Sequence, residues 1–169
     1  TRHIADVRTP HGLVLEFQHS HLSLAEQRER EAFYGNMVWV VDGTRAKGSL
    51  ARFLHWKWSF RPTHLEGILA SDVPGRCFPA RWVSSSVIVA FDFAGSDNIS
   101  PEDELWCLFP GRVAGHALAA PLPRGDLIRM AHEQNFIYET QGILAVVAKR
   151  YREQEAQWFG YPPARRAVL

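Results

Sequence analysis

The sequence predicts an α/β protein whose first 43 residues alternate strands and helix, followed by a β-rich and helical extension. Three observations support this fold class. Residues 3–18 alternate polar and apolar side chains on both sides of a turn, which is typical of a β-hairpin. Residues 24–34 carry the start and stop signals of a helix, and residues 37–41 form a continuous apolar run that indicates a buried strand.

The hairpin is the first element we expect. Pro10 fits the second position of a type I turn because its φ angle is already fixed, and Gly12 supplies the left-handed residue of a three-residue loop. This loop sets a register in which Asp6 lies directly opposite Glu16. Because side chains alternate along a strand, Gln18 lies on the same face as both carboxylates.

The two faces of this hairpin differ in character. The other face is expected to point into the core and carries Val7, Leu15 and Phe17. On the polar face, the opposed carboxylates of Asp6 and Glu16 repel each other, and a cation between them relieves that repulsion. A hard divalent ion takes one or two carboxylates together with waters and phosphate oxygens, which suits this cluster. A solvated face with an accidental acidic pair is the alternative interpretation.

The helix at residues 24–34 begins with a capping box, in which Ser23 precedes Glu26 by three positions. It is expected to end at Gly35. Within it, Glu26, Arg30 and Tyr34 recur every four residues and share a face. Two interpretations of that face are open: a solvated stripe with an ion pair, or a site in which Arg30 contacts phosphate through its two donors.

Taken together, residues 3–43 resemble the nuclease domain of the competence protein CoiA-like family, within the PD-(D/E)xK superfamily in the variant where Gln replaces the usual Lys. The matching positions are Asp6, Glu16, Gln18, Ser20, Glu29, Arg30, Tyr34 and Trp39. The resemblance implies a restriction-endonuclease-like core, which is a mixed sheet flanked by helices.

The resemblance also implies metal-dependent hydrolysis of phosphodiester bonds, in DNA rather than RNA. Asp6 and Glu16 would bind Mg²⁺ or Mn²⁺, with the backbone carbonyl of Phe17 as a further ligand, and Gln18 would position the attacking water. The substrate contacts implied are Arg30, Ser20 and Tyr34.

A second hypothesis is that the chain has this fold but no catalytic activity. The sequence begins without the helix that precedes the Asp strand in the family, and Gln18 lacks the positive charge of the usual Lys. The chain would then be a nucleic-acid-binding or assembly module. The opposed carboxylates argue against this hypothesis, since a protein that only binds phosphate gains nothing from them.

The extension, residues 44–169, opens with a basic and aromatic stretch. Within it, residues 55–60 alternate and predict a strand, with Trp56, Trp58 and Phe60 on a core face. His55 and Lys57 on the other face would be free to follow a nucleic-acid backbone. Further elements are expected as strands within 83–95 and 104–111, a loop at 112–125, a helix capped by Asp126, and a helix from about Tyr138 to Phe159.

Composition limits the remaining possibilities. The net charge of +1 gives no global basic field, so nucleic-acid binding would need a local patch. Cys77 and Cys107 are too few for a disulfide framework, and their spacing gives little support to a zinc site with His19 and His21. No membrane span or signal segment is apparent. The low cysteine count favours a reduced cytoplasmic setting, and no clear boundary divides residues 1–169, so we expect a single domain. The C-terminal helices are candidate surfaces for a protein partner or a homo-oligomer.

Overall fold

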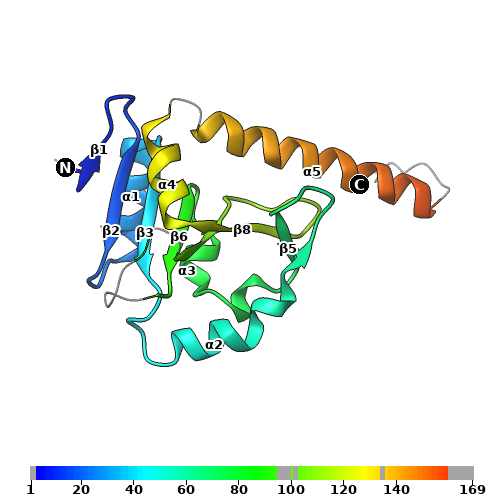
Figure 1. The fold of residues 1–169 in the computed structure, drawn as a ribbon, viewed down its shortest axis with the longest axis horizontal. Coiled ribbons are helices and arrows are strands. Elements are labelled where there is room, and N and C mark those ends of the chain that lie inside the picture. Colours follow the sequence, from blue (N-terminus) through cyan, green and yellow to red (C-terminus); the bar gives the residue numbers. More distant parts are fainter. Residues whose placement is uncertain (1–2, 95–99, 101–102, 134–135, 160–169) are drawn as a thin grey trace, which may run out of the picture.

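The computed structural model describes residues 3–94, 100, 103–133 and 136–159 (Figure 1). These residues form an α/β structure around one mixed sheet of eight strands, in the order β1-β2-β3-β6-β7-β8-β5-β4. In chain order the strands are β1 (Val7–Arg8), β2 (Val14–Gln18), β3 (Met37–Asp42), β4 (Arg61–Pro62), β5 (Leu69–Ser71), β6 (Ile88–Asp92), β7 (Glu104–Leu108) and β8 (Ala117–Pro123).

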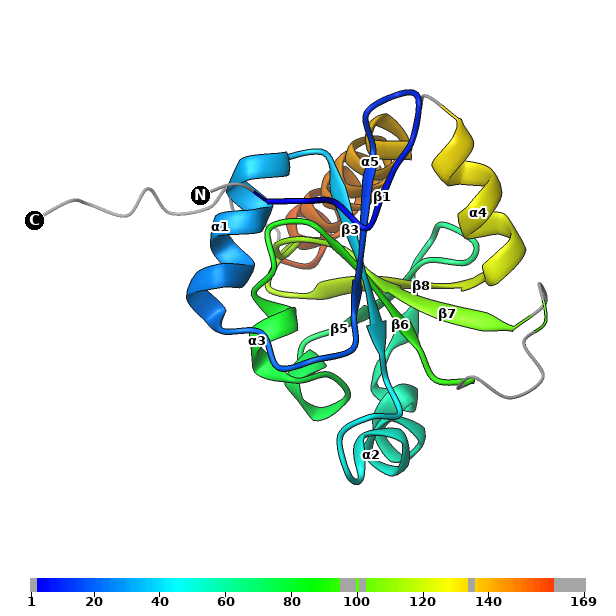
Figure 2. The same cartoon turned by 90° about the vertical axis from the view of Figure 1, so that its left-hand side faces the viewer.

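Helices cover both faces of this sheet. They are α1 (Leu24–Tyr34), α2 (Ser49–Trp56), α3 (Ala80–Val83), α4 (Arg124–His132) and α5 (Phe136–Phe159), with short 3-10 turns at Lys57–Ser59 and Pro74–Arg76. Figure 2 shows α1 and α3 on one side of the sheet and α4 on the other. None of the helices in the described part of the chain combines the length and hydropathy that a membrane span requires.

The core accordingly has two layers, one on each face of the sheet. The first lies beneath α2 and α3 and includes Trp39, Phe53 and Trp82. The second lies beneath α4 and α5 and includes Leu127 and Val147. Strands β3 and β6 contribute to both layers, as expected for parallel strands that are buried on both faces.

The hairpin register predicted from the turn is confirmed. Val7 pairs with Leu15 in an antiparallel ladder, and Gly12 has the left-handed φ of 84° that the loop requires. Helix α1 then carries the chain across to β3, which runs parallel to β2. The N-cap is confirmed as well, because the Ser23 hydroxyl accepts a 3.1 Å hydrogen bond from the Glu26 amide.

The burial of the two hairpin faces differs from the prediction. Glu16 exposes only 2% of its surface, whereas Val7 and Phe17, for which the sequence predicts a place in the core, expose 42% and 39%. Leu15 alone of that face packs against the core. The reason is that α1 lies over the Glu16 face, whereas Phe17 lines an open pocket beside α4.

The prediction of a strand at residues 55–60 is wrong. The segment completes α2 and continues as a 3-10 turn. Phe53 lies within α2 and Phe60 directly follows the 3-10 turn, and both enter the same core layer. An alternation of only six residues is too short to exclude a helical segment. His55 and Lys57 therefore do not share a strand face.

Trp58 also departs from the prediction, because it is 55% exposed and lies outside the core. Its ring stacks on Trp56 at a centroid distance of 5.6 Å, and the Arg61 guanidinium lies 5.5 Å from its centre. These contacts leave an aromatic and basic surface patch at the end of α2.

The loop predicted at residues 112–125 is wrong in part, because β8 runs from Ala117 to Pro123. The loop was predicted because of its prolines, which have no backbone N–H to donate to a β-ladder. They are tolerated here because β5 pairs only with Ala117, Leu118 and Ala119, so that Pro121 and Pro123 have a neighbour on the β7 side alone.

The C-terminal helices are present with shifted boundaries. Helix α4 begins at Arg124, so Asp126 lies in its first turn and is not its N-cap. Helix α5 spans Phe136–Phe159, which confirms the long helix predicted from about Tyr138. The strands expected within 83–95 and 104–111 are confirmed as β6 and β7.

Candidate active site

The candidate site lies at the β1–β2 edge of the sheet, between the hairpin and α1. Asp6 sits just before β1, and its Oδ2 accepts a 2.8 Å hydrogen bond from the amide of Phe17. Beyond the last paired residues of β1 and β2, the Phe17 amide therefore binds this side chain in place of a β1 backbone carbonyl. The bond holds the Asp6 carboxylate against β2. Asp6 itself is exposed, so its carboxylate stays accessible from solvent.

Glu16 lies on the buried face of β2, beneath α1. Its Oε2 accepts a 2.6 Å hydrogen bond from Nη1 of Arg30, and the two groups form an ion pair. Its other oxygen, Oε1, is buried and has no hydrogen-bond partner among the described residues. A buried carboxylate oxygen without a hydrogen bond of regular geometry is costly, which makes this atom a candidate ligand for a cation.

The pKa of Glu16 reflects these surroundings. Burial raises the pKa above its ordinary value, and the negative charge of Asp6 raises it further, while Arg30 lowers it. The net direction is upward. The two carboxylates are therefore close enough to repel each other, as the hairpin register predicts.

Arg30 and Tyr34 on α1 lie beside the same two carboxylates. Nη2 of Arg30 donates a 3.1 Å hydrogen bond to Glu26, one turn earlier, while its Nε is buried without a partner among the described residues. The Tyr34 hydroxyl is likewise buried and forms no hydrogen bond of regular geometry there, but it lies close enough to Glu16 to lower the pKa of that carboxyl by hydrogen bonding. The Nε of Arg30 and the Tyr34 hydroxyl thus lie beside the carboxylates, with the hydroxyl within reach of Glu16.

Gln18 and Ser20 lie farther along, at the carboxyl end of β2. Gln18 shares the Glu16 face, as predicted, but its Nε2 donates to the backbone carbonyl of Ser20 and both residues line a separate pocket. The structure therefore brings Asp6, Glu16, Arg30 and Tyr34 together and places the other two predicted residues next to them.

The donor set fits a hard divalent cation. The Phe17 amide points toward β1, and a strand residue presents its carbonyl on the same side as its amide, so the Phe17 carbonyl also faces the Asp6 edge. Two carboxylates and one carbonyl match the few protein ligands that Mg²⁺ takes. In the described part of the chain, no group of three or more His, Cys, Asp or Glu side chains could hold a metal ion, so any such ion would depend on waters or substrate as well.

The described residues give no support to a zinc site that includes both cysteines. Cys77 is buried in the core layer under α2 and α3, and Cys107 is buried in the opposite layer. Burial raises the pKa of the Cys107 thiol to about 12, so it remains protonated at neutral pH. The sheet separates the two thiols.

Sequence analysis misses the buried network of Glu31. This carboxylate exposes 5% of its surface and accepts hydrogen bonds from five donors: Gln27 Nε2, Trp39 Nε1, Ser85 Oγ and the amide and hydroxyl of Ser86. These bonds lower its pKa below the ordinary value even though burial alone would raise it. The network joins α1 to β3 and to the segment before β6, and so fixes the helix that carries Arg30.

Comparison with known proteins adds no assignment. No protein-family profile, no curated protein and no solved structure matches the chain.

Proposed function

We propose that the protein is a metal-dependent nuclease that hydrolyses phosphodiester bonds in nucleic acid, with DNA as the expected substrate. The observation that carries the proposal is the opposed carboxylate pair Asp6 and Glu16, whose negative charges repel each other. The buried Oε1 of Glu16 also makes no hydrogen bond of regular geometry among the described residues. A divalent cation would satisfy that oxygen and offset the repulsion between the two carboxylates.

The order of the elements supports a restriction-endonuclease-like core. An Asp segment, a Glu-x-Gln strand, a helix with Arg30 and Tyr34, and a strand with Trp39 follow one another as β1, β2, α1 and β3. The mixed sheet flanked by helices agrees with such a core. Arg30 and Tyr34 reach the carboxylates from α1, where the resemblance to the CoiA-like family places substrate contacts.

The proposed roles follow from these positions. Mg²⁺ or Mn²⁺ would be held by the Asp6 and Glu16 carboxylates and the Phe17 carbonyl, and would supply Lewis-acid activation of water and neutralisation of phosphate charge. Arg30 fixes the Glu16 carboxylate, and its Nε is a buried donor without a partner among the described residues, which a phosphate oxygen would reach only after a local rearrangement. The Tyr34 hydroxyl remains a proton donor at neutral pH because burial and the Glu16 charge raise its pKa.

The alternative function is a nucleic-acid-binding or assembly module on the same fold. Two observations favour it: Oε2 of Glu16 is already bound by Arg30, and the Gln18 amide is bound to the Ser20 carbonyl and is not directed at the carboxylates. Such a module would bind DNA equally well with or without a divalent ion.

A cleavage assay separates the two functions. End-labelled single- and double-stranded DNA is incubated with wild type in Mg²⁺, Mn²⁺ or EDTA, together with Asp6→Asn and the control Asp126→Asn. Asp126 lies on α4 in an exposed pair with Arg129, so its loss removes the same charge away from the site. We expect metal-dependent cleavage by wild type and the control, and none by Asp6→Asn. DNA binding by wild type without cleavage under any of these conditions would support the binding module.

A further inference from the structure

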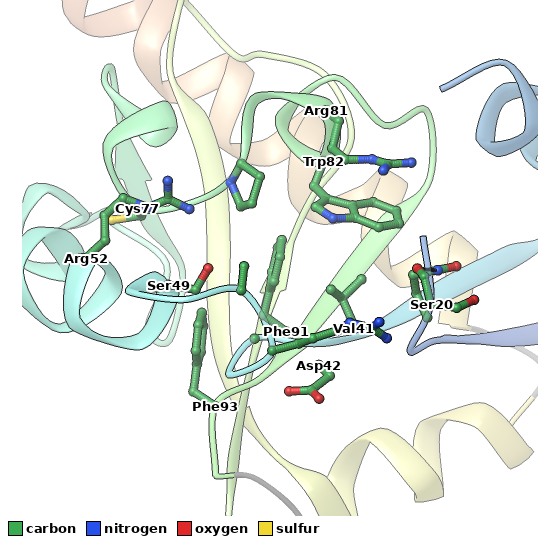
Figure 3. Close-up of a pocket in the computed structure, with 15 residues that line it drawn as sticks. Ser20, Val41, Asp42, Ser49, Arg52, Cys77, Arg81, Trp82, Phe91 and Phe93 are labelled. Atoms are coloured by element: carbon green, nitrogen blue, oxygen red, sulfur yellow. Dashed lines mark hydrogen bonds between the residues drawn. The ribbon is translucent and has the colours of Figure 1, made fainter. Parts of the chain in front are cut away.

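A second polar site lies where the parallel strands β2, β3 and β6 end. A pocket of about 210 Å³ opens there, on the same side of the sheet as α2 and α3 (Figure 3). Crevices at the carboxyl ends of parallel strands are common ligand sites, because loops and helix starts converge there. The proposed cleavage chemistry uses none of the charged residues of this pocket.

The pocket is strongly basic. Its charged lining consists of three arginines, Arg45, Arg52 and Arg81, and one carboxylate, Asp42. Arg45 and Arg52 are exposed and form no ion pair with a described residue, while Arg81 donates to the neutral side chain of Gln27. The Asp42 carboxylate is occupied by the amide and hydroxyl of Thr44. Three guanidinium charges therefore exceed the carboxylate charge by two.

The segment between β3 and α2 adds uncharged donors. The sequence GTRAKGS, residues 43–49, leads directly from the end of a parallel strand into the first turn of a helix. Gly48 has a left-handed φ of 79° and caps α2 without a side-chain hydrogen bond. The Ser49 amide donates to the Ala46 carbonyl, whereas the amides of Leu50 and Ala51 gain no side-chain acceptor. Such strand-to-helix loops hold phosphate in many nucleotide-binding proteins, because the helix amides and dipole favour an anion.

Ser49 gives an independent indication of a ligand. Only 9% of the residue surface is exposed, yet its hydroxyl lines the pocket and forms no hydrogen bond with a described residue. Figure 3 shows this hydroxyl pointing into the pocket from the α2 side, with Arg52 beyond it, while Ser20 and Arg81 lie across from them. Donors therefore face the cavity from two sides.

We infer that this pocket binds a phosphate monoester. A dianionic phosphate matches the charge excess of the lining, and arginine pairs with phosphate through two parallel donors. The volume is below the roughly 300–1,000 Å³ of pockets that enclose drug-sized ligands, which favours a single phosphate group over a whole nucleotide.

The position of the pocket indicates the source of that phosphate. Gln18 and Ser20 line it, and Gln18 is two residues from Glu16, about 6–7 Å along the strand. A terminal phosphate held here would place the end of a nucleic-acid strand beside the carboxylate pair. This assignment of the source rests on the proposed function, whereas the monoester site itself does not.

Binding is tested in EDTA, so that cleavage plays no part. The melting temperature of the full chain is measured with inorganic phosphate against chloride at equal ionic strength. The affinities of two DNA strands of one sequence, with a 5′-phosphate or a 5′-hydroxyl, are then compared by fluorescence anisotropy. The variants are Arg45→Gln and Arg52→Gln, both exposed positions, and the control is Arg28→Gln on α1, which removes one exposed charge away from the pocket.

We expect phosphate to stabilise wild type and the control, and the 5′-phosphate strand to bind at least about tenfold more tightly than the 5′-hydroxyl strand, the scale of one charge-assisted contact. Each pocket variant should lose most of both effects. No stabilisation of wild type by phosphate, or equal stabilisation of all variants, would overturn the monoester site. Phosphate stabilisation with equal affinity for the two strands would retain the site and overturn the strand end as its source. Because both measurements are made in EDTA, a protein without nuclease activity should still show the phosphate stabilisation expected for this pocket.

Discussion

The buried carboxylate of Glu16 on β2 accepts a 2.6 Å hydrogen bond from Nη1 of Arg30 on α1. The Glu16 side chain is 3% exposed and that of Arg30 25%, so the pair is largely shielded from solvent. This contact connects the strand that carries the candidate metal ligand to the helix that crosses over it. It gives Arg30 a structural role in addition to any contact with substrate.

Arg30→Ala is therefore expected to destabilise the fold. Removing one partner leaves the Glu16 charge buried and unpaired, which costs about 3 kcal/mol, near the lower end for buried pairs because Arg30 is partly exposed. The change itself favours the helix, since Ala is a good helix former. Urea unfolding provides the measurement, with Arg28→Ala as the control. Equal stabilities of the two variants would mean that the ion pair contributes little.

Glu31 is expected to control stability in acid. Its folded pKa lies below the ordinary 4.5, so its contribution is complete above that pH and is lost as the pH falls through the lowered folded value. Its hydrogen-bond donors are all uncharged, and the nearby Arg81 binds Gln27 and not Glu31. In Glu31→Gln we expect a loss of about 1–3 kcal/mol at neutral pH and a smaller further loss in acid. Parallel pH profiles for wild type and variant would contradict this.

A side chain at Gly43 is expected to destabilise the fold. A Cβ at this position would lie 2.5 Å from two ring carbons of Phe93 and 2.9 Å from the backbone oxygen of Asp92. The backbone contact cannot move away as a flexible side chain would, so Gly43→Ala should cost about 1–3 kcal/mol by overpacking. Gly75→Ala is the control, because nothing lies within 4 Å of the added Cβ there. Thermal unfolding of the two variants under one set of conditions tests the difference.

Gln18→Ala tests the predicted role of this amide in catalysis. The substitution removes a polar group but no ligand charge, so Mn²⁺ binding should survive while cleavage falls roughly 10²-fold or more, the scale for one positioned polar group. Gln18→Lys should retain some activity, because it restores the usual residue of the resembled motif. Unchanged turnover in Gln18→Ala would assign the placement of water to another group, which agrees with the bond from Gln18 to Ser20.

The elements predicted best are those with strong local signals. The turn at Gly12 sets the hairpin register, and the capping box at Ser23 sets the start of α1, because each depends on a few consecutive residues. The contact between Glu16 and Arg30 has no such local signal, because the spacing in α1 leaves open a solvated stripe or a phosphate contact, and only the family resemblance places Arg30 beside the site. The burial of β2 could not be predicted, since both of its faces carry apolar residues and long-range packing decides which face is covered.

The contacts missed by sequence analysis connect distant segments. The Glu31 network includes Ser86, which lies 55 positions away. The basic pocket combines Arg45 before α2 and Arg52 on α2 with Arg81 on α3. No periodicity or spacing relates such residues before the chain is folded. The prediction for the short segment 55–60 failed for a related reason. Burial in the core, and not the local alternation, decided between strand and helix there.

Titration calorimetry with Mn²⁺ tests the central claim, that Asp6 and Glu16 share a divalent cation. Asp6→Asn is the informative variant, because its amide oxygen can still accept the hydrogen bond from the Phe17 amide while the ligand charge is lost. We expect wild type to bind one Mn²⁺ and to melt at a higher temperature when loaded, and Asp6→Asn to lose both effects while folding normally without metal. Equal Mn²⁺ affinity in the two proteins would place the ion elsewhere and contradict the claim.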